Sequence, residues 1–388
     1  MNLFVQVVFW LCVVGIITPY LVYPAWLFLL SRFRTPRSET SGPVSVSFVI
    51  SVFNEAEVIR EKLNNSLALN YPKDLLEIVV ISDESDDGTD EIVKEFSNVR
   101  LIRQSPRQGK SAGITAAFEE LSGELIVFSD ANAIYQADAI GHLTKHFADP
   151  KVGYVVGRQM YGQSDGQAEQ SESTYWDFEL TLKAWESRLS SVVGGDGAIM
   201  AIRRDLFTPL KADDINDFII PLRIVAAGYR GRFEPQAVCY EEAAPSFAGE
   251  FRRKVRIVNR SIRAVSRVPQ SLNPFVVGIF AAQLFCHKVI RWFALFLMIG
   301  AFLGSGYLAV SGSRLYQLAF VAQASFYLLA VLAQLTAIRS FRPVTLVFYF
   351  CLANLAGGIG VMNFLIGKKF VTWTPQRTQT GSETSNCS

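Results

Sequence analysis

The chain has few of the residues that mark a disulfide-bonded, zinc-binding or nucleic-acid-binding protein. It contains five cysteines in 388 residues, and no two of them form a Cys-x-x-Cys pair, so neither a zinc site nor a disulfide framework is indicated. The net charge is only +2, which gives no bulk attraction to nucleic acid. We therefore expect reduced cysteines and no nucleic-acid partner.

Charged residues are also missing from long stretches at both ends of the chain. Leu3–Leu30 contains none, and it is longer than the ~20 residues that cross a bilayer. Arginines follow this run, whereas a removable signal peptide would begin with positive charge. The pattern predicts a retained transmembrane anchor over 1–31 whose carboxyl end is cytoplasmic, followed by a linker over 32–44.

The carboxyl-terminal part of the chain is predicted to be a second membrane region, over 292–366. Its apolar runs of spanning length are Phe293–Val310, Leu315–Ile338 and Val344–Ile366. The shorter apolar segment before it is expected to be an interfacial amphipathic helix, 273–291, and the end of the chain a polar tail, 367–388.

The last apolar run leaves the topology open. A single crossing would carry Lys368 and Lys369 to the outside, against the preference of basic residues for the cytoplasm. Alternatively, the glycine-rich stretch Asn354–Gly360 could break the run into a re-entrant hairpin that returns the tail to the cytoplasm.

Between the apolar ends, strand-like runs alternate with helix-compatible segments over 45–270. The first four runs are Ser45–Val52, Glu77–Ser82, Arg100–Arg103 and Glu124–Phe128. This alternation predicts an α/β fold with a parallel sheet. Because ligands of open α/β sheets bind at the carboxyl ends of the strands, we expect the site there. We divide the block into a nucleotide-sugar half, 45–157, and an acceptor or catalytic half, 158–270.

Polar side chains follow each of these runs and are expected to line one crevice. Asn54 and Glu55 follow the first run. Asp83 follows the second, where its carboxylate could accept hydrogen bonds from a nucleobase or ribose, or simply belong to a turn. Lys110 follows a glycine at a helix start, a combination that suits an anionic group.

Asp130 and Asn132 follow the fourth run. Two oxygen side chains at alternate positions beside a strand end can hold one divalent ion together with phosphate oxygens, and the alternative is a turn that caps the next helix. Oxygen ligands favour a hard cation, Mg²⁺ or Mn²⁺.

The second half of the block supplies aromatic, glycine and acidic candidates. Trp176 could stack on a sugar or pack in the core. Gly195 and Gly197, on either side of Asp196, permit close approach of the backbone to a ligand, or a strained turn. Asp217 lies at a helix start, as a general base or as an acid favoured by the helix dipole.

A basic block follows, containing Arg253 and Arg256. The two arginines share a helix face and could clamp a diphosphate. The alternative is a positive flank attracted to anionic lipid.

In this order, the motifs resemble those of membrane-embedded family-2 glycosyltransferases, the group of cellulose, chitin and hyaluronan synthases and bacterial exopolysaccharide enzymes. The resemblance implies a GT-A fold, a Rossmann-like mixed sheet, in a cytoplasmic catalytic domain flanked by transmembrane helices. It places Asp130–Asn132 at the family's metal-binding DxD motif and Gly195–Ala198 at the acceptor-side glycine segment. It also places Asn54, Glu55, Asp83 and Lys110 at the nucleotide and Asp217 at the catalytic base.

Two departures from the family pattern stand out. Asn132 replaces the second acid of DxD, which is expected to weaken metal binding in the absence of diphosphate. The Gln-x-x-Arg-Trp motif of processive synthases appears as Arg253–Ile257 and lacks the tryptophan that supports the acceptor end. The second departure disfavours long-chain polymerisation.

The resemblance implies an inverting transfer from a nucleotide-diphosphate sugar, expected to be a UDP-sugar, to a saccharide or lipid-linked hydroxyl. The enzyme would be a hexosyl- or N-acetylhexosaminyltransferase of cell-surface polysaccharide or glycoconjugate synthesis, in the bacterial plasma membrane with its catalytic domain in the cytoplasm. Asp217 would take the proton, while Arg253, Arg256 and a divalent cation stabilise the leaving diphosphate. The few spans suggest separate export partners.

Two other functions stay open at this stage. The missing tryptophan favours single-step transfer to a polyprenyl-phosphate carrier. A transporter or a non-catalytic membrane subunit of a polysaccharide assembly is disfavoured, because the acids are present and the spans carry almost no ionisable residues.

Overall fold

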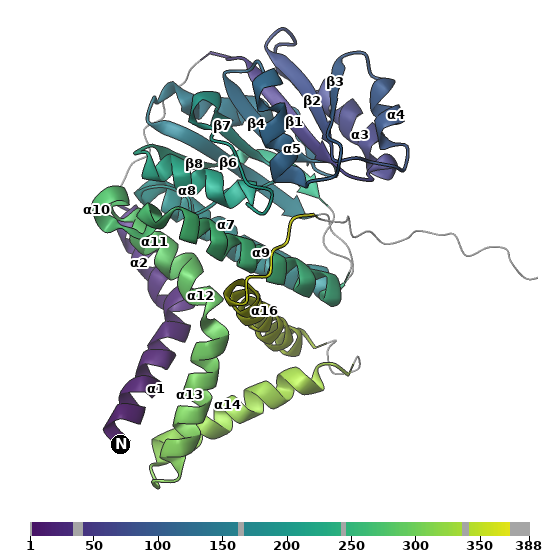
Figure 1. Ribbon diagram of the computed structural model, residues 1–388. Coiled ribbons are helices and arrows are strands. Elements are labelled where there is room, and N and C mark those ends of the chain that lie inside the picture. Colours follow the sequence, from purple (N-terminus) through teal and green to yellow (C-terminus); the bar gives the residue numbers. More distant parts are fainter. Residues whose placement is uncertain (1, 34–41, 162–166, 242–245, 336–340, 373–388) are drawn as a thin grey trace, which may run out of the picture.

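An eight-stranded mixed sheet lies at the centre of the α/β domain, in the order β3-β2-β1-β4-β7-β6-β8-β5 (Figure 1). The computed structural model describes residues 2–33, 42–161, 167–241, 246–335 and 341–372. Much of the expected linker, 32–44, and most of the expected tail, 367–388, lie outside these ranges. The strands are β1 Val46–Val52, β2 Leu76–Ser82, β3 Val99–Arg103, β4 Leu125–Asp130, β5 Ile134–Tyr135, β6 Val152–Tyr161, β7 Met200–Arg203 and β8 Arg230–Glu241.

The first four strands form the predicted parallel part of the sheet. β1 pairs in parallel with β2 and β4, and β2 with β3. All seven residues of β1 are buried, as expected for a parallel strand covered on both faces. β7 then pairs antiparallel with both β4 and β6, which makes the sheet mixed.

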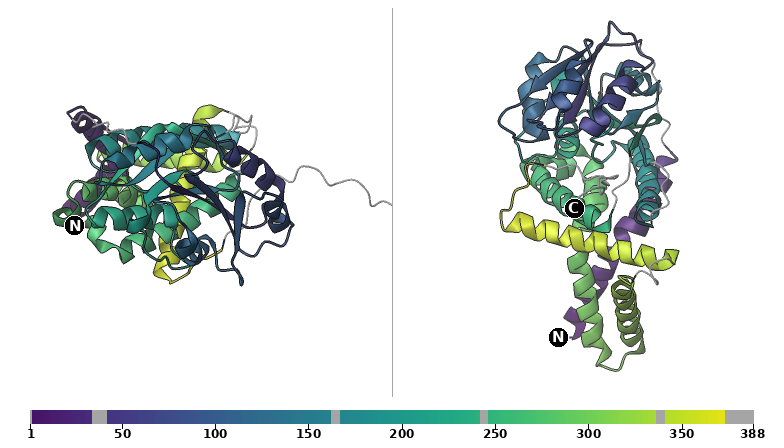
Figure 2. Two further views of the ribbon diagram at one scale, coloured as in Figure 1. Left: turned by 90° about the horizontal axis from the view of Figure 1, so that it is seen from above. Right: turned by 90° about the vertical axis from the view of Figure 1, so that its right-hand side faces the viewer.

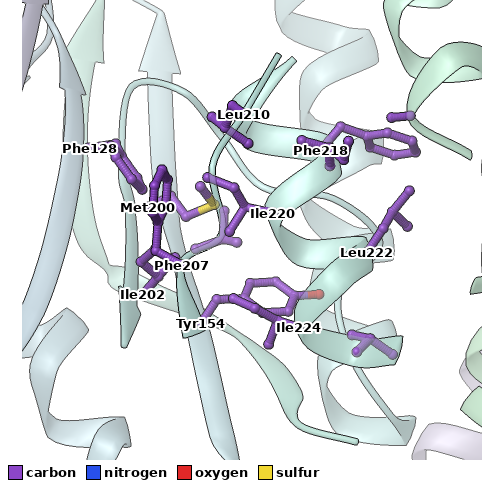
Figure 3. Close-up of a cluster of buried hydrophobic side chains, with 14 of the residues drawn as sticks. Phe128, Tyr154, Met200, Ile202, Phe207, Leu210, Phe218, Ile220, Leu222 and Ile224 are labelled. Atoms are coloured by element: carbon purple, nitrogen blue, oxygen red, sulfur yellow. The ribbon is translucent and has the colours of Figure 1, made fainter. Parts of the chain in front are cut away.

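Helices cover both faces of the sheet. Those of the α/β domain are α3 Ala56–Leu67, α4 Thr89–Lys94, α5 Lys110–Ala117, α6 Ala139–Thr144, α7 Gln167–Leu189, α8 Asn216–Ala226 and α9 Phe247–Arg267. Figure 3 shows how one face is filled: Met200 and Ile202 of β7 pack toward Ile220 and Ile224 of α8. Burial of these side chains fixes the start of α8, and with it Asp217, against the sheet.

Apolar helices extend from the α/β domain on one side (Figure 1). α1 Asn2–Ile17, a π-helical turn Thr18–Val22 and α2 Tyr23–Ser31 form the first, and α13 Ala294–Ala309 and α14 Arg314–Leu332 form a pair beside it. Small residues allow close packing, because a Cβ at Gly300 would lie 2.8 Å from the sulfur of Cys12.

Three helices among the described residues are long and apolar enough to cross a membrane: Asn2–Ser31, Arg314–Leu332 and Pro343–Leu365. A fourth is possible if Phe280–Trp292 and Ala294–Ala309, bent by 63°, form one span. The segment expected as a single interfacial helix, 273–291, is divided into α10 Pro274–Val277, α11 Phe280–Leu284, a π-helical turn Phe285–Val289 and α12 Ile290–Trp292.

The last helix, α16 Arg342–Leu365, is continuous, so the re-entrant hairpin is wrong. Its glycines serve packing instead: a Cβ at Gly358 would meet Leu295 of α13, and one at Gly360 would meet Val258 of α9. α16 lies across the directions of α1 and α13, beneath the α/β domain (Figure 2).

The residues after α16 return to the α/β domain. Both Asn259 and Arg263 of α9 donate to the carbonyl of Lys368 at 3.1 Å. A Cβ at Gly109 would lie 2.7 Å from the carbonyl oxygen of Val371. Residues 367–371 therefore cross α9 and end beside the loop before α5, on the domain's side of the apolar helices (Figure 1).

Candidate active site

The turns after β1 and β2 are joined to each other at the carboxyl edge of the sheet. Asn54 adopts a left-handed conformation, with φ of 54°, and its side chain exchanges hydrogen bonds with Asp86 at 2.7 and 3.0 Å. Glu55 is buried, and its backbone N–H donates to Thr89 at 2.8 Å. The structure thus places Asn54 and Glu55 at the predicted edge.

Asp83 organises the loop that leads to Lys110. Its side chain is buried (2% exposed) and accepts hydrogen bonds from the backbone of Gln108 at 2.9 Å and of Gly109 at 3.0 Å. The guanidinium of Arg107 lies 3.3 Å from the centre of the Phe53 ring. Contact of Asp83 with a nucleotide stays a prediction, but the carboxylate has a structural task in the loop.

Three candidates from distant parts of the chain meet at Gly197. A Cβ at Gly197 would lie 3.4 Å from Asp217 Oδ2, 3.5 Å from Lys110 Nζ and 3.6 Å from Asp130 Oδ2. Lys110 pairs with the carboxylate of Asp130 and lies 3.4 Å from the Gly197 carbonyl oxygen. The glycine leaves room for these three side chains to converge.

Asp217 stands in an environment that disfavours its charge. Its backbone carbonyl accepts from Gly195 N–H at 2.5 Å, and its Oδ1 is buried with no hydrogen-bond partner in the described part of the chain. Burial raises the pKa of Asp217, and the charges of Asp196 and Asp130 raise it further, against the opposing effect of Lys110. A carboxylate with a raised pKa is a better proton acceptor near neutral pH.

Asp196 and Trp176 are linked through Lys183. Asp196 is buried and pairs with Lys183 at 3.3 Å, and burial raises the pKa of Asp196. The Lys183 ammonium also lies 4.7 Å from the Trp176 ring, whose Nε1 donates to the Gln159 carbonyl at 2.7 Å. Trp176 therefore supports the glycine segment Gly195–Ala198 through Lys183, and stacking on a sugar stays a prediction.

Arginines of α9 bring positive charge close to Asp217. Arg253 donates to Glu250 at 2.7 Å. Burial lowers the pKa of Arg256, an effect opposed by the negative charges of Asp217 and Asp130. Arg256 therefore lies close enough for its charge to interact with both carboxylates. Its contact with a diphosphate stays a prediction.

The other two acids near the start of α8 are structural. Asp213 and Asp214 both form ion pairs with Arg267 of α9, that of Asp213 at 2.8 Å. Burial alone would raise the pKa of Asp213, but Arg267 outweighs it and lowers the pKa overall. These pairs hold α8 against α9 and leave Asp217 facing the site.

Arg260 and Glu241 are site residues that the sequence did not single out. Arg260 is buried, donates to the Asp214 carbonyl, and has its pKa lowered by burial to about 10. Glu241 ends β8 and accepts from Gln159, and burial, with Asp130 and Asp196 adding, raises its pKa to about 8. Two sequence signals could have identified them: Arg260 lies four residues, about one helical turn, after Arg256, and Glu241 stands at the end of a strand.

Asp130 and Asn132 offer a divalent cation two oxygen side chains. The Asp130 carboxylate is 40% exposed at the end of β4, hence accessible to a ligand. Among the described residues, no group of three or more His, Cys, Asp or Glu could hold a metal ion. The two residues fit a cation whose remaining ligands come from a diphosphate and water.

The contact between Gly195 and Asp217 makes a first prediction. A Cβ at Gly195 would lie 2.2 Å from the Met200 sulfur and 2.6 Å from the Asp217 carbonyl oxygen, so Gly195→Ala must displace the start of α8. We expect kcat for sugar transfer to fall by about 100-fold, because ~1 Å of misplacement has such a cost. Gly141→Ala, where nothing lies within 4 Å, is the matched control. An unchanged kcat in folded Gly195→Ala would refute the positioning of Asp217 by this contact.

Comparison with known proteins identifies the domain. The mannosyltransferase PcManGT from Pyrobaculum calidifontis, solved in complex with GDP-Man and Mn²⁺, superimposes with a TM-score of 0.72. The match covers 94% of this chain and 100% of that chain at 22% identity, and it shows the fold. The sheet with its flanking helices is a GT-A glycosyltransferase fold, as the resemblance implied.

The sequence comparisons give the family. Residues 47–210 match the family described as Glycosyl transferase family 2, and this part of the chain is a family-2 glycosyltransferase domain. The probable glycosyltransferase YdaM of Bacillus subtilis is 29% identical over 228 residues, 54% of each chain. The poly-beta-1,6-N-acetyl-D-glucosamine synthase of Staphylococcus aureus (strain COL) is 24% identical over 220 residues, 54% of this chain and 53% of that protein. The chain thus spans about half the length of these curated relatives.

Proposed function

We propose that this protein is an inverting glycosyltransferase that moves a sugar from a nucleotide-diphosphate donor to an acceptor hydroxyl. The observation that carries the proposal is the convergence of Asp217, Lys110 and Asp130 within 3.4–3.6 Å of one point at Gly197. This arrangement brings a proton acceptor close to groups suited to a diphosphate.

Asp217 is the general base of the proposed reaction. Its Oδ2 would lie 3.4 Å from a Cβ at Gly197, and it takes the proton of the acceptor hydroxyl as that oxygen attacks the anomeric carbon. The new bond forms opposite the carbon–oxygen bond to the diphosphate, which breaks, so the configuration inverts.

The leaving diphosphate is stabilised by cationic side chains. Lys110 from α5, together with Arg256 and buried Arg260 from α9, supplies positive charge close to Asp217. Asp130 and Asn132 would hold Mg²⁺ or Mn²⁺, which supplies further positive charge to the diphosphate oxygens when bound. PcManGT is described with Mn²⁺ and GDP-Man, which supports a divalent cation and a nucleotide sugar.

The proposed setting is a membrane. The spanning candidates, and a relative named as a polysaccharide synthase, support a plasma-membrane enzyme. We place its α/β domain in the cytoplasm because arginines follow the first apolar run. We propose a UDP-sugar as donor and a saccharide or lipid-linked acceptor, with export left to partner proteins. Transfer to a polyprenyl-phosphate carrier is the alternative, favoured by the absent tryptophan after Arg256.

Transfer from labelled nucleotide sugars by the detergent-purified protein tests the proposal. We expect incorporation from one donor that requires Mn²⁺ or Mg²⁺. A label that extracts into organic solvent and is released by mild acid would identify the carrier phosphate, whereas a water-soluble oligosaccharide would identify a saccharide acceptor. No transfer and no nucleotide binding with any donor would overturn the proposal.

A further inference from the structure

A lysine is fully buried behind the metal-binding turn. Lys62 lies on the inward face of α3 with Ile59 and Leu63, and its side chain is 0% exposed. Its Nζ lies between two aromatic rings, 4.9 Å from the centre of Phe48 and 4.4 Å from that of Tyr135. No carboxylate within the described ranges forms an ion pair with it. Burying an amine without a counter-ion costs folding free energy, so we expect Lys62 to have a role that offsets this cost.

The hydrogen bonds of Lys62 go to the two residues that bracket Asp130–Asn132. Its Nζ donates to Ser129 Oγ at 2.8 Å and to the Ala133 carbonyl oxygen. Ser129 Oγ in turn donates to the Asp130 carbonyl at 3.2 Å, and Ala133 N–H donates to that same carbonyl at 3.3 Å. One amine therefore ties together the start and the end of the turn that carries both oxygen side chains.

We propose that Lys62 is a positioning residue for the divalent-cation site, because its two hydrogen bonds fix the backbone turn from which Asp130 and Asn132 project. The inference rests on the proposed function, in which these two residues hold the cation. Burial lowers the pKa of Lys62 to about 7, and both the ammonium and the neutral amine have enough N–H groups to donate to Ser129 and Ala133.

Lys62 acts on the geometry of the ligands and touches no substrate. A cation with two protein oxygens depends on their spacing, and loss of groups that orient metal ligands weakens metal affinity by about 10- to 100-fold. The role differs from that of Lys110, which pairs directly with the Asp130 carboxylate.

The test measures Mn²⁺ binding by the full-length protein, and the electron paramagnetic resonance signal reports the concentration of free Mn²⁺. UDP or GDP is present, whichever of the two the wild-type protein binds. Lys62→Met keeps the apolar stem between Phe48 and Tyr135 and removes the donors. We expect its Kd for Mn²⁺ to rise by about tenfold. Lys73→Met is the matched control, because exposed Lys73 also donates to backbone carbonyls, of Leu67 and Leu69, away from the turn.

A second variant covers the case in which Lys62→Met does not fold. Ser129→Ala removes only the accepting hydroxyl and is expected to weaken Mn²⁺ binding in the same direction by a smaller factor. Wild-type Mn²⁺ affinity in folded Lys62→Met, or in Ser129→Ala if the first variant does not fold, would overturn the inference alone. A wild-type protein that binds no Mn²⁺ with either nucleotide would overturn the proposed function as well.

Discussion

Asp217→Asn is expected to lower kcat for sugar transfer by about 1,000-fold or more while donor binding persists. Asparagine has nearly the same shape, so the contacts at the start of α8 remain, but it cannot accept the acceptor's proton. The measurement is the initial rate of transfer, with nucleotide binding followed by calorimetry. Asp217→Asn that binds donor and transfers sugar at the wild-type rate would exclude Asp217 as the base.

Asp213→Asn is the matched control for this substitution. It changes an acid four residues earlier that pairs with Arg267 and does not face the site. We expect a lower unfolding temperature for Asp213→Asn with kcat largely retained. The opposite pattern, loss of transfer in Asp213→Asn and not in Asp217→Asn, would show that Asp217 is not the base.

The raised pKa of Asp217 gives this substitution a pH signature. The pKa of Asp217 is higher in the folded protein than in the unfolded chain. The ionised carboxylate therefore lowers the free energy of unfolding above the raised pKa. This loss of stability vanishes below the ordinary aspartate pKa of about 3.9, where the group is protonated in both states. Asp217→Asn should therefore unfold at a temperature a few degrees higher near neutral pH, with the gain lost in acid. In the wild type, the acid limb of the kcat/KM profile should lie above that ordinary value.

Asp130→Ala is expected to lower transfer by about 100-fold or more, because it removes one of two protein oxygens from the proposed cation site. It also removes the carboxylate that pairs with Lys110. The measurement is transfer rate against Mn²⁺ concentration, together with Mn²⁺ binding in the presence of nucleotide. Asp74→Ala, an exposed acid in the turn before β2, is the control.

Asn132→Asp provides the converse change. It restores the second acid of the DxD pattern, so we expect tighter Mn²⁺ binding and half-maximal activity at a lower Mn²⁺ concentration. If Asp130→Ala and Asn132→Asp both titrate with Mn²⁺ like the wild type, this turn does not hold the cation.

The first half of the α/β domain, residues 45–157, was largely predictable from sequence because its signals are local. Continuous Val- and Ile-rich runs form buried parallel strands, and the polar residue after each run, such as Asp83, lies at the carboxyl edge of the sheet. The roles of these residues are still predictions, since geometry alone assigns no substrate.

Other features depended on contacts between distant residues. The glycines of α16 read as a break in sequence, yet they permit close packing of a continuous helix on α9 and α13. Asp213, Asp214 and Asp217 form one acidic cluster in sequence, and only the arginines of α9 separate the two structural acids from the candidate base.

The sequence by itself determined the first four strands, the apolar segments, and the positions of Asp130 after a strand and Asp217 at a helix start, because periodicity and strand ends are properties of neighbouring residues. Tertiary structure decided that Lys110, Asp130 and Asp217 meet at Gly197. It also decided that Lys62 lies behind the turn that carries Asp130 and Asn132, and that residues 367–371 return to the domain. These features come from packing between segments far apart in the chain. Such packing sets the distances between side chains, their burial and their pKa values together, so no local sequence pattern encodes them.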